Sequence, residues 1–249
     1  MSGYTKVTSL LDDTLSLALE NQDSQNRVEL DEAPDSWYSA HFTLNSTRFD
    51  YDIYPDKIVD GPYTMTADSG KELHSTYENN TWKLTEDISG LPQFTAENMP
   101  ISEALYNMAL QESLEDIFTE TSVHTGEKVE VFNTGANWNK VWTRDTAMSV
   151  QYSLAWAFPE QSGNSLLQKI QGDPQEWVED TGTGGSYPAS TDRIILAMAA
   201  WETYLATGDT EFLEKVYDVT EYTLEKDFHV NYDPNTGLFK MCIRDRLPY

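Results

Sequence analysis

An arginine and an aspartate stand side by side at residues 144 and 145, just before an apolar-periodic run that reaches Phe158. The pair is expected at the start of a helix. Arg144 offers a planar fork of hydrogen-bond donors and Asp145 offers only acceptors, so together they can grip hydroxyl groups in a directional way. Trp138 and Trp142 precede them and provide apolar faces. Donors, acceptors and aromatic faces in this arrangement are typical of a sugar subsite.

The string Trp142-Thr143-Arg144-Asp145 closely resembles the tryptophan-threonine-arginine-aspartate signature of glucoamylase-like glycoside hydrolases. A looser version occurs in glycogen-debranching and related glycosidases. These enzymes are built on a barrel of six helical hairpins, the (α/α)6 barrel. The resemblance covers roughly residues 100–240. It implies that Arg144 and Asp145 hold hydroxyls of the sugar in the cleaved subsite and that neither is the proton donor.

A second constellation is the glycine-rich loop that follows Glu179 and Asp180 and leads into Asp192. Its glycines let the backbone approach a ligand closely, and the next helix start adds N–H donors. A phosphate cradle is disfavoured, because the loop lacks the P-loop lysine and follows acidic residues. In the resembling glycosidases an equivalent loop lines the sugar pocket. The resemblance thus makes Trp177 and Tyr187 stacking candidates and places Asp192 at the pocket rim.

Cleavage of a glycosidic bond normally needs two carboxyl groups, one protonated and one ionised. The chain has 42 Asp and Glu residues, so their number does not identify the pair. Asp192 is the candidate catalytic carboxyl, and we expect it to point into the same cavity as Arg144 and Asp145. The alternative is that Asp192 caps its own helix and faces solvent. The family's proton donor follows a turn that residues 233–238 resemble.

The character of the sequence changes again after residue 240. Residues 241–249 bring a basic cluster and the single cysteine, Cys242, into an acidic chain, and they are interpreted as foreign sequence similar to adapter read-through. Twelve helices need on the order of 300 residues, whereas about 150 follow Pro100. We therefore expect a truncated enzyme with the first hairpins of an incomplete barrel, lacking its base and its acid.

The elements that must position these residues are predicted from periodicity. Residues 1–29 are expected to form a polar leader. Residues 30–95 mix aromatic and β-branched residues with turn formers, which predicts antiparallel strands in a β-rich, sandwich-like N-terminal domain. Residues 100–240 are helical in pattern and form the partial (α/α)6 catalytic domain. The predicted fold class is therefore α+β.

Four helices are expected in the second part of the chain. Ser102 is a candidate cap for the first, and the second runs from Thr143 toward Pro159, which ends it. The third opens near Thr191 and ends at Gly208, which suits a left-handed cap, and Asp209 or its successor starts the fourth. Helices joined by so short a turn form a hairpin.

Three large side chains of these helices, Trp156, Met198 and Trp201, lie on apolar faces and are expected in the core. An unclosed barrel would change this expectation. Faces such as that of Ile194, Met198 and Trp201 would then be left partly unpaired and would expose a hydrophobic patch.

A net charge of −26 and a pI near 4.2 disfavour nucleic acid and anionic membranes as partners. Solubility or a salty habitat also explains the acidity. The start of the chain resembles neither a signal peptide nor a membrane span. We expect a cytoplasmic protein, or a periplasmic or secreted one if an export signal is missing. One cysteine and four isolated histidines give no ligand spacing, so neither a metal nor a cofactor is predicted.

The expected function is that of a glycosidase fragment that cleaves neutral, glucose-like oligosaccharides by paired-carboxylate catalysis. One alternative is a glycoside phosphorylase on the same barrel. The other is a non-catalytic helical protein that binds carbohydrate or serves as a scaffold, since a likeness of fold does not fix chemistry.

Overall fold

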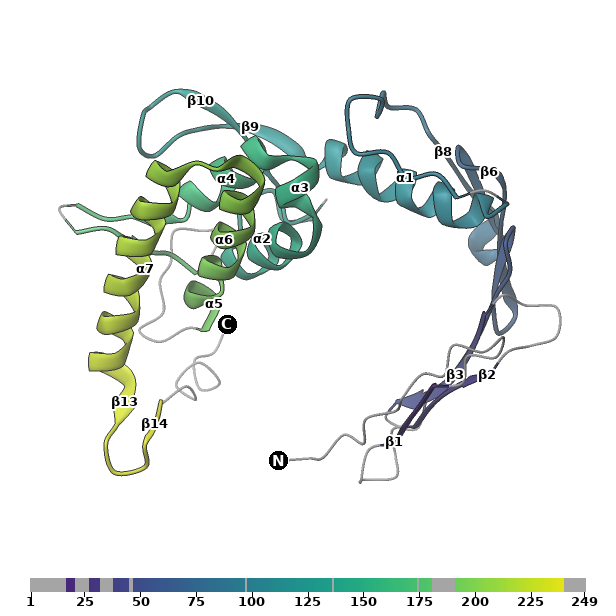
Figure 1. The fold of residues 1–249 in the computed structure, drawn as a ribbon, viewed down its shortest axis with the longest axis horizontal. Coiled ribbons are helices and arrows are strands. Elements are labelled where there is room, and N and C mark those ends of the chain that lie inside the picture. Colours follow the sequence, from purple (N-terminus) through teal and green to yellow (C-terminus); the bar gives the residue numbers. More distant parts are fainter. Residues whose placement is uncertain are drawn as a thin grey trace. The chain divides into compact units, whose positions relative to one another are not determined.

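The computed structural model describes residues 17–20, 27–31, 38–44, 47–96, 98–135, 137–173, 175–180 and 191–239 (Figure 1). The chain divides into two units, residues 1–112 and residues 113–249. An antiparallel sheet comes first and helices follow, so the α+β class is confirmed. The proposed foreign tail at 241–249 lies outside the described residues.

The first unit is built on one antiparallel sheet, in which each described strand pairs with the next along the chain. It is a single layer rather than the two facing sheets of a sandwich, and it begins within the segment expected to be a polar leader. The strands are β1 (Leu17–Glu20), β2 (Arg27–Asp31), β3 (Tyr38–Leu44), β4 (Thr47–Ile53), β5 (Lys57–Asp60), β6 (Tyr63–Ser69), β7 (Glu72–Ser75) and β8 (Asn80–Lys83), with a 3-10 turn at Tyr77–Asn79.

Helix α1 (Pro100–Glu115) packs on this sheet. Ala67 and Leu73 of the sheet and Ile101 and Ala104 of the helix form a buried apolar cluster. The helix begins at Pro100, whose missing N–H suits a first turn, so Ser102 lies inside the helix and is not its cap. Its residues up to 112 belong to the first unit.

Short β-hairpins in the second unit were not predicted. β9 pairs with β10 directly after α1 in the sequence, β11 pairs with β12 ahead of the glycine-rich loop, and β13 pairs with β14 after the last helix. Pairing with a partner strand, rather than periodicity within one, defines such short elements. Their bounds are β9 (Ile117–Thr121), β10 (Lys128–Phe132), β11 (Ile170–Gln171), β12 (Trp177–Val178), β13 (Tyr232–Asp233) and β14 (Leu238–Phe239).

The helix predicted from Thr143 is present and contains an unexpected turn. Helix α2 (Thr143–Ser149) continues through a π-helical turn, η2 (Val150–Leu154), into α3 (Ala155–Ala157). Pro159 not only follows the end of this helix but also occupies the first position of α4 (Pro159–Leu167).

The predicted helical hairpin is confirmed. A short helix, α5 (Thr191–Ile194), precedes α6 (Leu196–Thr207) and α7 (Thr210–Asn231). Gly208 ends α6 in the left-handed region with φ 71°, and the Asp209 carboxylate accepts a hydrogen bond from the Phe212 backbone N–H at 3.0 Å. Both are the caps that the sequence indicated. The apolar core joins this hairpin to the preceding helices and consists of Ala147, Val150, Ala155, Leu166, Ile170, Val178, Leu196, Ala199, Ala200, Phe212, Val216 and Val219.

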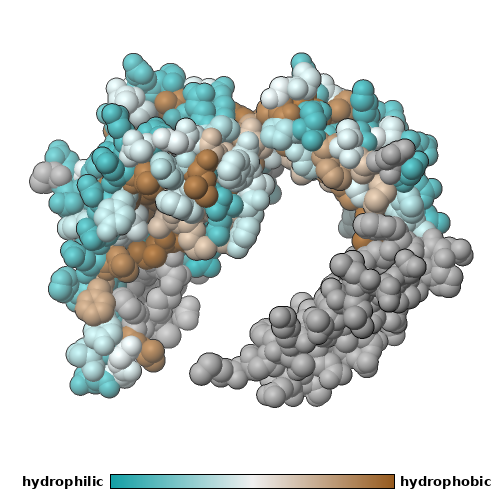
Figure 2. Space-filling model, viewed as in Figure 1, coloured by the Kyte–Doolittle hydropathy of each residue, from teal (hydrophilic) through white to brown (hydrophobic). Residues whose placement is uncertain are grey.

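Trp156, Met198 and Trp201 are half or more exposed, so their expected place in the core is wrong. Helix α6 turns smaller side chains, such as Ala199 and Ala200, toward the core. No described element covers its other face, and Figure 2 shows hydrophobic side chains at the surface over α6 and α7. The described helices form a hairpin packed on α2 to α4 and do not close into a barrel.

Candidate functional site

The start of α2 is fixed from two directions. Trp142 precedes the helix in an extended conformation, and its backbone N–H donates to the Thr134 hydroxyl at 3.3 Å. The buried Thr143 hydroxyl donates to the backbone carbonyl of Glu179, next to the glycine-rich loop. These bonds hold the helix end against both neighbouring segments, so the side chains that follow are presented from a defined backbone.

The Trp138 and Trp142 rings meet edge to face, with 5.4 Å between centroids. Trp138 is exposed and Trp142 is half-buried. The pair therefore offers an accessible aromatic surface directly before Arg144, as the sequence analysis expected for a stacking platform.

Arg144 forms an ion pair with Asp192, the first acidic residue of α5. The Arg144 side chain is 54% exposed, whereas that of Asp192 is only 12% exposed. Asp192 is therefore not a solvent-facing cap. The structure thus brings the segment of Arg144 and the segment of Asp192 into direct contact. The catalytic role of Asp192 stays a prediction.

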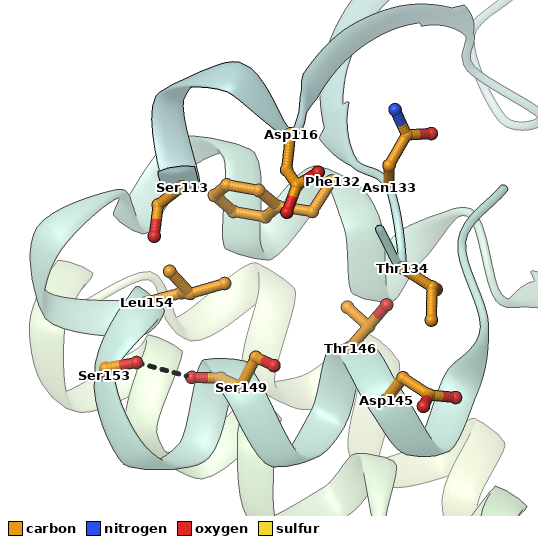
Figure 3. A pocket seen from close by; sticks show the side chains of 10 residues that line it. All are labelled: Ser113, Asp116, Phe132, Asn133, Thr134, Asp145, Thr146, Ser149, Ser153 and Leu154. Carbon is orange, nitrogen blue, oxygen red and sulfur yellow. Dashed lines mark hydrogen bonds between the residues drawn. The ribbon is translucent and has the colours of Figure 1, made fainter. Parts of the chain in front are cut away.

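Asp145 lies at a pocket that Arg144 and Asp192 do not line. It is exposed at the edge of a pocket of about 190 Å³ within the second unit, the Asp116 pocket (Figure 3). The expectation that Asp192 shares one cavity with both Arg144 and Asp145 is therefore met only by its contact with Arg144. The lining residues are Ser113, Asp116, Phe132, Asn133, Thr134, Asp145, Thr146, Ser149, Ser153 and Leu154.

Asp116 is a residue that the sequence analysis missed. It lies between α1 and β9, and its backbone carbonyl accepts a hydrogen bond from the Asn133 N–H at 2.8 Å. Burial raises the pKa of its carboxyl, and the negative charge of Glu115 adds to the effect. Only the pairing of β9 with β10 brings Asp116 beside α2, and no motif or spacing marks that pairing in the sequence.

Of the two stacking residues predicted around the glycine-rich loop, Trp177 and Tyr187, the structure describes only Trp177. The ring of Trp177 lies in the β11–β12 hairpin, where the Lys226 ammonium sits 4.4 Å from its centroid. One face of this ring is thus taken by a cation. Tyr187 lies outside the described residues, together with most of the glycine-rich loop.

Two buried ion pairs flank that loop. The Lys169 ammonium lies 3.7 Å from the Glu179 carboxylate, and the Arg193 guanidinium donates to Asp227 at 2.9 Å. Burial lowers the pKa of Lys169 and raises the pKa values of Glu179 and Asp227. The second pair ties α5 to α7, and because Arg193 follows Asp192 it also fixes the helix that carries Asp192.

No protein family, curated protein or solved structure matches this chain. Among the described residues, no group of three or more His, Cys, Asp or Glu side chains could hold a metal ion. In the same part of the chain, no helix combines the length and the apolar character needed to cross a membrane.

Proposed function

We propose that the protein binds a neutral, glucose-like oligosaccharide and hydrolyses it as a glycosidase. In this proposal Arg144 and Asp145 hold hydroxyls of the sugar in the cleaved subsite, Trp138 and Trp142 contact its apolar face, and Asp192 is a catalytic carboxyl. The observation that carries it is the Arg144–Asp192 ion pair, because it joins a basic and an acidic group directly after the Trp138–Trp142 aromatic pair, of which Trp138 is exposed.

The chemistry of these groups suits hydroxyl recognition. A guanidinium carries five N–H donors in one plane, and more than half of the Arg144 side chain is accessible to a ligand. Asp145 contributes acceptors from the same helical turn. Hydrogen bonds between charged groups and neutral hydroxyls are stronger than bonds between neutral groups, which favours specific binding of a polyol.

A carbohydrate-binding protein without hydrolytic activity is the second candidate. The ion pair with Arg144 favours it, because a carboxylate engaged by a guanidinium is a poorer base than an unengaged one. Both candidates predict sugar binding, and only the glycosidase predicts release of new reducing ends.

Binding is tested on this chain by calorimetric titration with a panel of neutral oligosaccharides. Hydrolysis is tested by release of reducing sugar, on a form of the protein that carries the complete catalytic domain. Replacing Asp145→Asn removes a charged acceptor that contacts the sugar. We expect kcat/KM on the best substrate to fall roughly 30- to 1000-fold, equivalent to about 2–4 kcal/mol of transition-state stabilisation.

The matched control is Asp218→Asn, because Asp218 is an exposed aspartate of α7 that lies outside the site. It should leave kcat/KM unchanged. An Asp145→Asn variant with the parental kcat/KM would remove Asp145 from the subsite. Binding of sugar without any cleavage would favour the second candidate.

A further inference from the structure

We propose that the Asp116 pocket is itself a sugar site, which takes one polyhydroxylated ring and uses Asp116 and Thr146 as contact residues beside Asp145. The ligand class rests on the function proposed above. Neither Asp116 nor Thr146 belongs to the tryptophan-threonine-arginine-aspartate string.

Two buried oxygen atoms in these walls have no hydrogen-bond partner, the Thr146 hydroxyl and the Asn133 side-chain carbonyl. Thr146 is only 4% exposed. A buried polar atom without a partner destabilises the folded protein, and such atoms are rare in native structures. In Figure 3 the Thr146 hydroxyl and the Asp116 carboxyl extend from opposite walls toward the pocket. A ligand with several hydroxyls could supply the missing partners.

The half-buried Asp116 carboxyl is a second candidate contact in the same pocket. Among the described residues, no side chain or backbone group forms a hydrogen bond or an ion pair with it, and burial raises its pKa. Glu115, the one charged neighbour that shifts this pKa appreciably, carries the same sign. A hydroxyl donor from a ligand would stabilise the ionised carboxylate, whereas a phosphate or carboxylate ligand would be repelled.

The volume and the lining residues of the pocket limit the size and the chemical class of the ligand further. Its volume of about 190 Å³ is below the roughly 300–1,000 Å³ of pockets for drug-sized ligands, so it suits one small ring. Phe132 and Leu154 contribute apolar surface, and serine and threonine hydroxyls surround them. A sugar ring matches this mixture, because it presents C–H faces and O–H edges.

The variants Thr146→Val and Asp116→Asn test the inference, because each is expected to weaken sugar binding without lowering the Tm. Each replaces a group that the folded protein leaves unsatisfied with one of similar shape, so neither should lower the Tm. Each also removes a proposed ligand contact. We expect the Kd for glucose or a maltooligosaccharide, measured by calorimetric titration of the full chain, to rise at least about tenfold in each variant. The control Asp218→Asn should keep the wild-type Kd.

A residue with a merely structural role would behave in the opposite way, with a lower Tm and an unchanged Kd in the folded fraction. That result in both variants would overturn the inference. So would a wild-type chain that binds Ca²⁺ through Asp116 and Asp145 but binds neither sugar.

The outcomes separate this inference from the proposed function. If Arg144→Lys abolishes binding while both pocket variants bind like the wild type, the pocket is not a sugar site and the proposed function stands. If Asp116→Asn weakens glucose binding and the wild type cleaves no glycoside, the pocket stands and hydrolysis is wrong. A wild-type chain that binds no sugar would overturn both.

Discussion

Buried ion pairs stabilise the backbone segments that carry the residues of the site. Removing two charges from water is costly, and only their mutual attraction offsets that cost, so a buried pair is far more sensitive to loss of one partner than to loss of both. Lys169 and Glu179 form such a pair, and the Glu179 backbone carbonyl also anchors Thr143 at the start of α2. The pair thus stabilises the segment that presents Arg144.

For Lys169→Met we expect the free energy of unfolding, measured by urea denaturation at neutral pH, to fall by about 3–5 kcal/mol, because Glu179 is left buried without its counter-charge. The double variant Lys169→Met/Glu179→Leu should recover most of that loss. A double variant as unstable as the single one would show that packing, rather than charge, explains the effect.

Asp116 should make the protein less stable as the pH rises. Its folded-state pKa lies above the ordinary value of 3.8, so the folded protein holds this proton more tightly than the unfolded chain does. Stability then declines as pH rises from 3.8 through the raised pKa, and the full penalty is present at neutral pH.

Urea midpoints of the wild type and Asp116→Asn should therefore coincide near or below pH 3.8 and diverge above it, with the Asn variant more stable. Equal midpoints at every pH would mean that the Asp116 carboxyl is not desolvated in the folded protein.

Some residues of the candidate site could be predicted from the sequence and others could not. Residue types and flanking tryptophans marked Arg144, and Asp192 was linked to it only by its place after a glycine-rich loop. Asp116 carries no such mark, because its importance arises from burial and from a strand pairing that joins it to Asn133.

The caps of the helical hairpin act at the scale of elements. Gly208 has φ 71°, and a Cβ at this position would meet nothing within 4 Å. Replacing Gly208→Ala therefore leaves only the backbone penalty of the left-handed conformation, and we expect a loss of about 1 kcal/mol of unfolding free energy.

Gly163→Ala is the matched comparison, because Gly163 lies within α4 and its added Cβ would make an ordinary 3.7 Å contact with Thr203. We expect this variant to gain roughly 0.4–1 kcal/mol in the same thermal or urea unfolding measurements. A similar loss in both alanine variants would argue against the left-handed end of α6.

Elements with strong local signals were the predictable ones. The α6–α7 hairpin follows from apolar spacing, Gly208 and Asp209, all of which act within a few residues. The first helix was placed three residues late, since Ser102 resembled a cap and the first-turn role of Pro100 was overlooked. The short strands of the second unit were missed because each depends on a partner strand.

The second unit as a whole exposes an unusually apolar surface. A groove between α6 and α7 is lined mainly by apolar side chains, among them Trp201, Leu213 and Leu224. Met198 and Phe228 are also exposed on these helices. Contiguous apolar surface of this kind is uncommon on soluble monomers and favours association.

We expect the full chain to bind a hydrophobic dye such as anilinonaphthalene sulfonate, and Trp201→Gln to reduce the dye fluorescence without lowering the Tm, because Trp201 is half-exposed. Phe94→Gln, at an exposed aromatic of the first unit, should leave the dye signal unchanged. A wild-type chain that binds no dye would show that this surface is covered in solution.

The α+β class was predictable at the scale of the molecule because it follows from periodicities of 2 and 3.6 residues in successive parts of the chain. The arrangement of layers was not. Whether strands form one sheet or two, and whether hairpins close into a barrel, depends on contacts between distant segments that leave no periodic trace.

The π-helical turn at Val150–Leu154 interrupts the helix that runs from Thr143 to Ala157. A π turn holds one residue more than α-helical geometry requires, so it is equivalent to a single-residue insertion that the helix has absorbed. Deleting one residue there would restore a regular α-helix and leave α2 and α3 in their present phase, because the turn already absorbs the extra residue. Only side chains inside the turn would change direction, and Ser153, which lines the same pocket as Asp145, is one of them. The π turn therefore fixes the directions of the side chains inside it, while the helix before it and the helix after it keep a common phase.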